Sequence, residues 1–367
     1  MNTPRAIAAQ LIHHSLRVSP GEKVLLDVTG TADDYIEAIV TEVYEAGAEP
    51  HVIQHSFPVL KSLVASSSQA QLQRWAAADV ARIRSMNVYI GLRAEQNPYE
   101  LYDLPEERYR DYVTHYLQPK QYAMGSLSKW NLLKTPTSSW AQLAHMSNRA
   151  YERLYRDACT MDYAAWAAAV QPLSEMFATA KHVRITGPST ELTFSVEGMT
   201  SMICAGQYNL PDGEWFTAPV LDSVEGHIQF NVPTSYMGTS CDQVRLVFRH
   251  GCVVEASAAV NQHWLEQMLE QDEGARKVGE FGIGLNPHIV KPTQNLIFDE
   301  KMQGSLHLAL GQAYPMADNG NVSRLHWDFV LLQSESHGGG SIEVDGELVR
   351  HNGRFVLPEL EALNGPA

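Results

Sequence analysis

Residues 23–54 read KVLLDVTGTADDYIEAIVTEVYEAGAEPHVIQ, and this stretch decides the fold class of the first half of the chain. It begins with a nearly continuous apolar run, 23–28, continues with a helical pattern over 33–45, and closes with a second strand-like run, 51–54. Gly47 follows the helical pattern, and glycine is common just after the last residue of a helix. A strand, a helix and a strand in this order predict a βαβ unit with parallel strands.

The same alternation continues towards the middle of the chain. Residues 87–91 (NVYIG) predict a third strand. Further helices are predicted over 4–16, 69–81 and 105–117. The segment 138–180 is rich in helical patterns, and we expect Pro172 to kink or break its last helix, 162–180.

After residue 181 the pattern changes to short β-rich runs, several of which alternate apolar and polar residues. These runs are 182–186, 191–196, 227–232, 244–248 and 252–256. Two-residue turn signals join neighbouring runs at 250–251 (HG), 345–346 (DG) and 352–353 (NG). We therefore expect an α/β N-terminal domain with a parallel sheet over 1–180, followed by an α+β, largely antiparallel C-terminal domain over 181–367.

Composition excludes several classes of protein. The 367 residues are 44% hydrophobic and 19% charged, which argues against a disordered chain, a coiled coil or a disulfide-stapled miniprotein. Lys and Arg number 27 against 42 Asp and Glu, so the net charge is −15. A chain this acidic repels phosphate backbones, and we expect no nucleic-acid partner.

We expect a cytoplasmic protein without a membrane segment. No apolar run reaches the roughly 18 residues of a membrane-spanning helix, and the first residues lack the pattern of a signal peptide. The four cysteines are scattered, with no CxxC pair, which is typical of free thiols in a reducing compartment.

The second half contains polar residues in unusually apolar surroundings. His326 and Asp328 flank Trp327 at the start of an apolar run, so on a strand they would share a face. An imidazole beside a carboxylate is half of a divalent-metal site, although a buried hydrogen-bonded pair has the same pattern. His307 and Glu280 also lie in apolar runs, and a buried carboxylate needs a cation or donors.

Two more carboxylates complete a possible ligand set. Glu214 follows a turn and leads into aromatic residues, and Glu300 is either a ligand or the salt-bridge partner of Lys301. The full set holds six oxygen and nitrogen donors: Glu214, Glu280, Glu300, His307, His326 and Asp328. Six such side chains suffice for two metal ions if one carboxylate bridges and water completes the coordination. Such a centre hydrolyses an amide or an ester.

Long motifs in a fixed order resemble a known family. They are NLPDGEWFTAP (209–219), LVFRHGCVVEASA (246–258), DEGARKVGEFGIGLN (272–286), LIFDEKMQGSLHLALGQAY (296–314) and NVSRLHWDF (321–329). With these motifs the chain resembles the aminopeptidase T / aminopeptidase S / PepS family of metallo-aminopeptidases. The resemblance covers nearly the whole chain.

The resemblance implies a metal-dependent aminopeptidase with its catalytic, metal-binding domain at residues 181–367. Two divalent ions, Zn, Co, Mn or Mg, would be held by the six donors, and the water they activate would release N-terminal residues from peptides with a free N-terminus. Glu280 is then the bridging or catalytic carboxylate, and Tyr314, in GQAY, is the active-site tyrosine. The resemblance also implies a homodimer.

Two features keep alternatives open. The spacing between Glu300 and His307 is longer here than in the family's better-known pattern, DENAASH, which makes Glu300 the least certain ligand. His307, His326 and Asp328 alone would form the two-histidine, one-carboxylate set of a single Fe(II) ion, as in ring-cleaving 2,5-dihydroxypyridine dioxygenases on a similar fold. A metal-stabilised binding protein without turnover is a third reading. The presence of Glu214 and Glu280 favours the aminopeptidase.

Overall fold

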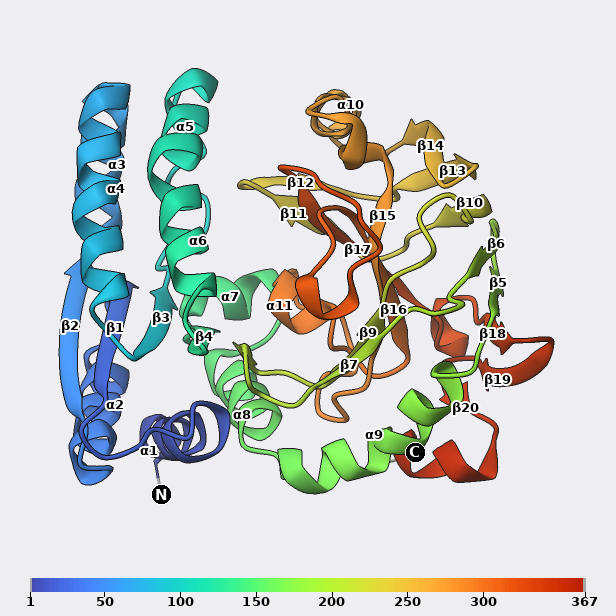
Figure 1. Ribbon diagram of the computed structural model, residues 1–367, viewed down its shortest axis with the longest axis horizontal. Coiled ribbons are helices and arrows are strands. Elements are labelled where there is room, and N and C mark those ends of the chain that lie inside the picture. The colour runs from blue at the N-terminus through green and yellow to red at the C-terminus, as the bar shows by residue number, and fades with distance from the viewer. Residues whose placement is uncertain (1, 366–367) are drawn as a thin grey trace. The chain divides into compact units, whose positions relative to one another are not determined.

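The computed structural model describes residues 2–365, and the chain divides into two compact units (Figure 1). Unit 1 comprises Met1–Met161 with Gly206–Pro211, and unit 2 comprises Asp162–Ala205 with Asp212–Ala367. The predicted boundary lies near residue 180. Helix α9 (Tyr163–Phe177) precedes that position and already belongs to unit 2, which begins at Asp162.

Unit 1 contains a five-stranded sheet in the order β2-β1-β3-β4-β8. Its strands are β1 (Lys23–Gly30), β2 (Glu49–His55), β3 (Val88–Ala94), β4 (Lys129–Lys134) and β8 (Asn209–Leu210). All four strand pairs are parallel, which confirms the predicted α/β class. The sequence patterns did not predict β4 or β8, and β8 is the segment that returns to unit 1 after residue 205.

Helices connect these strands. They are α1 (Thr3–Ala9), α2 (Asp33–Glu45), α3 (Phe57–Ser66), α4 (Gln69–Arg84), α5 (Glu106–Tyr112), α6 (Gln118–Gly125), α7 (Ser138–Leu143) and α8 (Asn148–Cys159), with π-helical turns at Gln10–Ser15 and Val113–Leu117. Helix α2 has its predicted bounds, and Gly47 beyond it adopts φ +74. Leu25, Ile83, Tyr89 and Ala123 form a cluster in which α4 and α6 pack against β1 and β3.

One charged residue is buried in the apolar strand β1. Asp27 is 2% exposed, and its Oδ2 accepts a hydrogen bond from the Tyr89 hydroxyl at 2.7 Å. Nζ of Lys120 lies 3.0 Å from the same oxygen. Burial raises the pKa of Asp27, but the charges of Lys120 and Arg93 outweigh burial and lower it to about 2. The ionised carboxylate is therefore a stabilising component of unit 1.

Unit 2 contains two main sheets. The first, in the order β14-β13-β10-β6-β5-β18-β19-β20, comprises β5 (His182–Gly187), β6 (Thr190–Ser195), β10 (Glu225–Gln229), β13 (Arg245–Arg249), β14 (Cys252–Ser257), β18 (Ser341–Val344), β19 (Glu347–His351) and β20 (Arg354–Phe355). The second, which we call the site sheet, has the order β17-β16-β15-β9-β7 and comprises β7 (Ser201–Cys204), β9 (Glu214–Thr217), β15 (Val278–Gly284), β16 (Ser305–Gly311) and β17 (His326–Leu332). The strand pairs within both sheets are antiparallel, as predicted.

Short elements complete unit 2. A hairpin, β11 (Thr234–Tyr236) and β12 (Thr239–Cys241), stands apart from the main sheets, and the other helices are α10 (Gln262–Leu269) and α11 (Leu296–Asp299). Helix α9 runs through Pro172, so the proline does not break the helix, while the predicted kink stays a prediction. Leu173 and Phe177, on the far side of the proline, are buried in the unit 2 core, and this packing offsets the one backbone hydrogen bond that proline cannot donate.

The two main sheets share one hydrophobic core. Phe194 of β6 and Phe281 of β15 lie with their ring centroids 5.1 Å apart. Trp327 of β17 and Phe329 pack in the same cluster. The site sheet therefore has one face committed to the core, and its other face is free to carry polar side chains.

We predict that Asp27→Asn destabilises the protein most at neutral pH. The folded-state pKa of about 2 lies below the ordinary value of 3.8, so the carboxylate contributes stability above about pH 4 and loses it as the pH falls towards 2. At pH 7 the variant should lose about 2 kcal/mol or more, because Lys120 and Arg93 lose the buried carboxylate that compensates their charges, and Lys120 keeps only Asp79, at 3.4 Å.

Urea unfolding of both proteins at pH 7 and near pH 2.5 measures the difference. The exposed Glu37→Gln on α2 is the control and should be silent at both pH values. A gap between Asp27→Asn and wild type that is equally large at both pH values would show that the carboxylate charge is not the stabilising feature.

Candidate metal centre

The polar face of the site sheet carries most of the residues that the sequence singled out. Because successive strand residues point to opposite faces, Phe281 and Trp327 enter the core while Glu280, His326 and Asp328 lie on the other side. The predicted strand placement of His326 and Asp328, with Trp327 pointing away, is confirmed. Strands β9, β15, β16 and β17 are hydrogen-bonded neighbours and run side by side in Figure 1, so their polar residues meet.

A first group of potential ligands comes from three adjacent strands. Nε2 of His307 on β16 lies 3.4 Å from Oε1 of Glu280 on β15 and 3.5 Å from Oε2 of Glu214 on β9. All three residues are at most 5% exposed. Their donor atoms converge on one small volume, as ligands of a single cation would.

A second group lies next to the first. Nε2 of His326 is 3.4 Å from Oε2 of Glu280 and 3.9 Å from Oδ2 of Asp328. Nδ1 of His326 lies 2.8 Å from the carbonyl oxygen of Gln312, to which it donates. That bond leaves the lone pair of Nε2 directed at the carboxylates, the arrangement typical of a metal-binding histidine.

Glu280 belongs to both groups, with one oxygen facing each histidine. Ligands placed 2.0–2.2 Å from a tetrahedral ion lie about 3.3–3.6 Å apart. The distances between Glu280 and the two imidazoles fall in this range. Of the two roles that the family resemblance allows Glu280, the geometry favours the bridging one, because both oxygens are engaged.

The centre has a surplus of buried negative charge. Burial raises the pKa of Glu280, but hydrogen bonds with His307 and His326 outweigh burial and lower it to about 2. Burial lowers the pKa of His307 in turn, and the carboxylates of Glu280 and Glu214 overcome this and raise it to about 9. Oε2 of Glu214 is buried and has no hydrogen-bond partner among the described residues. A cation between these groups would compensate the charge and occupy the unpaired oxygen.

Glu300 does not join either group. It follows α11, and its Oε1 lies 2.7 Å from Nζ of Lys301. The same ammonium lies 2.5 Å from Oε1 of Glu214. The structure shows the salt bridge of Glu300, and burial together with the charge of Glu300 also raises the pKa of Asp328, so its role as a ligand stays a prediction. Lys301 itself was not recognised as part of the centre.

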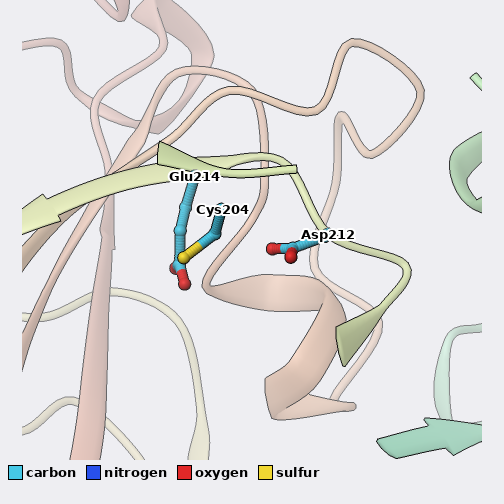
Figure 2. Close-up of side chains that lie close together, drawn as sticks. All are labelled: Cys204, Asp212 and Glu214. Carbon is cyan, nitrogen blue, oxygen red and sulfur yellow. The ribbon is translucent and has the colours of Figure 1, made fainter. Parts of the chain in front are cut away.

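A thiol and another carboxylate border the centre near Glu214. Figure 2 shows Cys204 at the end of β7 beside the Glu214 carboxylate, with Asp212 directed towards both. Asp212 is fully buried, and its Oδ1 lies 3.9 Å from Nζ of Lys301. Neither residue stood out in the sequence, because an isolated cysteine and an Asp-Gly turn are common in structural positions.

Tyr314 lies beside the second group. Its ring centroid is 4.5 Å from that of His326 and 5.8 Å from that of Phe216. Unlike the ligand candidates it is 39% exposed. A phenol that is partly open to solvent and next to the centre can reach a bound substrate.

A glycine makes room for the centre. Gly282 pairs with His307 on one side and with Phe216 on the other. A Cβ atom at Gly282 would lie 2.1 Å from Cε1 and Nε2 of His307, so the imidazole occupies the space of the missing side chain. Gly282 did not stand out in the sequence as a residue of the centre. Glycine inside an apolar strand next to Glu280 was the available signal.

Comparisons with known proteins find a metalloprotease family and relatives named as aminopeptidases. The family model described as thermophilic metalloprotease (M29) matches residues 3–355. Aminopeptidase T of Thermus aquaticus is 24% identical over 399 residues, covering 96% of this chain and 98% of the relative. Aminopeptidase 2 of Geobacillus stearothermophilus is 24% identical over 387 residues, covering 90% of each chain.

Solved structures share the fold. Wild-type AmpT from Thermus thermophilus superposes with a TM-score of 0.81 at 22% identity, covering 97% of this chain and 99% of that one. A 2,5-dihydroxypyridine dioxygenase from Pseudomonas putida has a TM-score of 0.62 at 12% identity, covering 98% and 99%. At these identities the likenesses establish the fold alone.

We predict that Gly282→Ala displaces the His307 ring and lowers the divalent-metal content of the purified protein. The added methyl group overlaps the imidazole, so the ring or the strand must move, which should also cost about 1–3 kcal/mol of stability. Elemental analysis and thermal unfolding measure both effects. Gly125→Ala at the end of α6, where nothing lies within 4 Å of the new Cβ, is the control. Normal metal content in Gly282→Ala would mean that the His307 ring position is unimportant for metal binding.

Proposed function

The chain belongs to the M29 family of metalloproteases, and from that membership we propose that it is a metal-dependent aminopeptidase, a hydrolase that removes N-terminal residues from peptides. The observation that carries the proposal is the shared carboxylate of Glu280, which faces His307 with one oxygen and His326 with the other. That arrangement suits two neighbouring ions, and paired ions are a common solution for hydrolysing a peptide bond.

We propose two divalent ions, Zn, Co, Mn or Mg, since all the donors are oxygen or nitrogen. One would be held by Glu214, Glu280 and His307, and the other by Glu280, His326 and Asp328. Glu300, the sixth residue of the predicted set, contacts Lys301 with Oε1, and burial together with its charge raises the pKa of Asp328, so we propose it as a further ligand at the edge of the centre. Each ion would then have three protein ligands and space for water or substrate.

The side chains around the centre have separable roles. When bound, the ions lower the pKa of water and polarise the carbonyl of the substrate. Glu280 keeps the two ligand groups at a fixed separation and supplies charge to both. Tyr314 lies against the His326 ring. Its hydroxyl would donate a hydrogen bond to the carbonyl oxygen of the substrate, on which negative charge develops during hydrolysis.

We further propose a peptide substrate with a free N-terminus, a homodimer and a cytoplasmic location. The family resemblance supports the first two. The cysteines Cys159, Cys204, Cys241 and Cys252 are all free, which supports a reducing compartment. No helix within the described residues is both long and apolar enough to span a membrane.

The single-iron dioxygenase reading fits the centre less well. It would place His307, His326 and Asp328 around one ion. In the structure, the Nε2 atoms of the two histidines face different oxygens of Glu280 and fall into different ligand groups. The dioxygenase likeness at 12% identity concerns the fold.

We predict that the protein cleaves leucine arylamide and leaves its N-acetylated form intact, because an aminopeptidase binds the free α-amine. Exhaustive chelation should abolish turnover, and added divalent ions should restore it. Arylamine release, with residual metal checked by elemental analysis, is the measurement. Equal rates on both substrates would indicate an endopeptidase or an esterase, and full turnover without metal would exclude the metal-dependent mechanism.

We predict that Glu280→Gln folds but turns over at least about a hundredfold more slowly, because the carboxylate that both ligand groups share is lost. Glutamine keeps the volume and removes the charge shared by both ligand groups, so metal content should fall as well. Stability of the metal-free form should stay the same or rise, because an uncompensated buried charge disappears.

Glu273→Gln is the matched control, because Glu273 is exposed and lies in the 3₁₀ turn just before β15. It should match wild type in rate and metal content. Glu280→Gln with most of its activity and full metal occupancy would make Glu280 a structural carboxylate.

A further inference from the structure

Arg350 of β19 is buried and has no carboxylate partner within the described residues. It is 1% exposed, and its guanidinium donates hydrogen bonds to the Ser305 carbonyl at 2.7 Å and to Oε1 of Gln333 at 2.9 Å. Its Nε is buried and has no hydrogen-bond partner among the residues that the structure describes. Burial lowers the pKa of Arg350 to about 9, and no carboxylate within residues 2–365 offsets this effect. A buried charge without a counter-ion is unfavourable, so an anion close by would stabilise this part of unit 2.

A pocket of about 640 Å³ adjoins the residues that hold this guanidinium. Its wall includes Gly304 and Ser334, which directly neighbour Ser305 and Gln333 in the chain. Neighbouring Cα atoms are about 3.8 Å apart, so the buried charge lies roughly one residue behind the wall. The volume falls in the range that is typical of small-molecule sites. None of the predicted metal ligands lines the pocket, which is therefore separate from the metal centre.

Hydrogen-bond donors are frequent in the wall of this pocket. Gly304, Ser334 and Gly353 line it, and their amides have no backbone acceptor among the described residues. The hydroxyl of Ser336 and the exposed guanidinium of Arg354 are further donors. Backbone amides together with a guanidinium are a common way to hold a phosphate group, because each of its oxygens can accept hydrogen bonds. The donor set therefore favours an anion with several oxygens.

The charges in the wall and directly behind it leave a positive surplus. Arg354 and Glu335, both exposed, line the pocket and balance each other. Arg350 behind the wall adds a positive charge that no described carboxylate compensates. A bound anion would supply the missing negative charge, although the chain as a whole carries a net charge of −15.

We propose that this pocket binds a small organic molecule that carries a phosphate group. The phosphate would lie against the amides of Gly304, Ser334 and Gly353 and the guanidinium of Arg354. Val290, an apolar residue that is 63% exposed, also lines the pocket and offers a contact for the organic part. A carboxylate fits less well, because it offers fewer oxygens and less charge than a phosphate monoester, which carries about two negative charges at neutral pH. Such a site is independent of the proposed aminopeptidase activity.

Calorimetric titration of the full chain with phenyl phosphate tests the proposal. Because phosphates also bind divalent metal ions, the titration is carried out before and after exhaustive chelation. We expect one molecule of phenyl phosphate to bind per chain after chelation. Inorganic phosphate should compete for the same site with lower affinity, because it lacks the organic part.

Arg354→Gln should weaken the binding of phenyl phosphate at least about tenfold in Kd, because it removes the charged donor from the wall. Arg249→Gln is the matched control, because Arg249 is an exposed arginine of β13 that does not line the pocket. The control should stay within about twofold of wild type, since a distant exposed charge is screened by salt.

Arg350→Gln tests the buried charge itself and should also weaken the binding of phenyl phosphate. Circular dichroism checks that this variant folds. If it does not fold, the comparison of Arg354→Gln with Arg249→Gln decides.

Three results would overturn the proposal. Absence of phenyl phosphate binding after chelation would show that the pocket is not a phosphate site. Equal weakening in Arg354→Gln and Arg249→Gln would show only non-specific attraction between charges. Benzoate bound as tightly as phenyl phosphate would show that the pocket does not select the phosphate group.

Discussion

Buried negative charge on the back of a hydrophobic sheet is the constraint on which unit 2 depends. Glu214, Glu280 and Asp328 come from three strands and face two imidazoles, while Phe281 and Trp327 on the same strands fill the core. The period of two along each strand enforces this division, because a slip by one residue would exchange core and centre. The same strand register therefore pairs the strands, buries the apolar side chains in the core and brings the ligand residues together.

The small residues in this sheet follow from the same condition. Gly282 leaves space for the His307 ring, and Ala309 lies between Glu280 and Asp328 in the register of the strands. Larger side chains at these positions would separate groups that must lie about 3.5 Å apart to share an ion. The small residues Gly282 and Ala309 therefore provide the space in which the ligand residues can approach one another.

Sequence patterns predicted those elements whose structure depends on interactions between residues close together in the chain. Helix α2 and the turns at Gly251 and Gly346 follow from helical period, capping and positive φ. Strand β8 could not be found in this way, because two residues pair with β4 only once the chain has returned from unit 2. A helix break at Pro172 was a wrong expectation, because the cost of the proline is local while the packing that offsets it comes from distant segments.

The sequence also indicated most of the residues that the structure brings together in the candidate site. Polar residues in apolar runs pointed to Glu280, His307, His326 and Asp328, since a buried charge has few explanations. Lys301 escaped notice because an acid followed by a lysine is typical of a solvent-exposed surface, and nothing in the local pattern shows that this lysine is buried.

The return of residues 206–211 to the parallel sheet has a consequence for how the chain can be divided. The polypeptide passes from one unit to the other at 161, again at 205 and again at 211, so neither unit is a continuous piece of the gene. A fragment ending at residue 161 would lack β8 and expose β4 as an unpaired edge, which favours aggregation. On the ribosome, the parallel sheet cannot be completed before residue 210 has been synthesised, and the first strand of the metal centre, β9, follows within a few residues. Domain exchange between relatives would need three cuts rather than one.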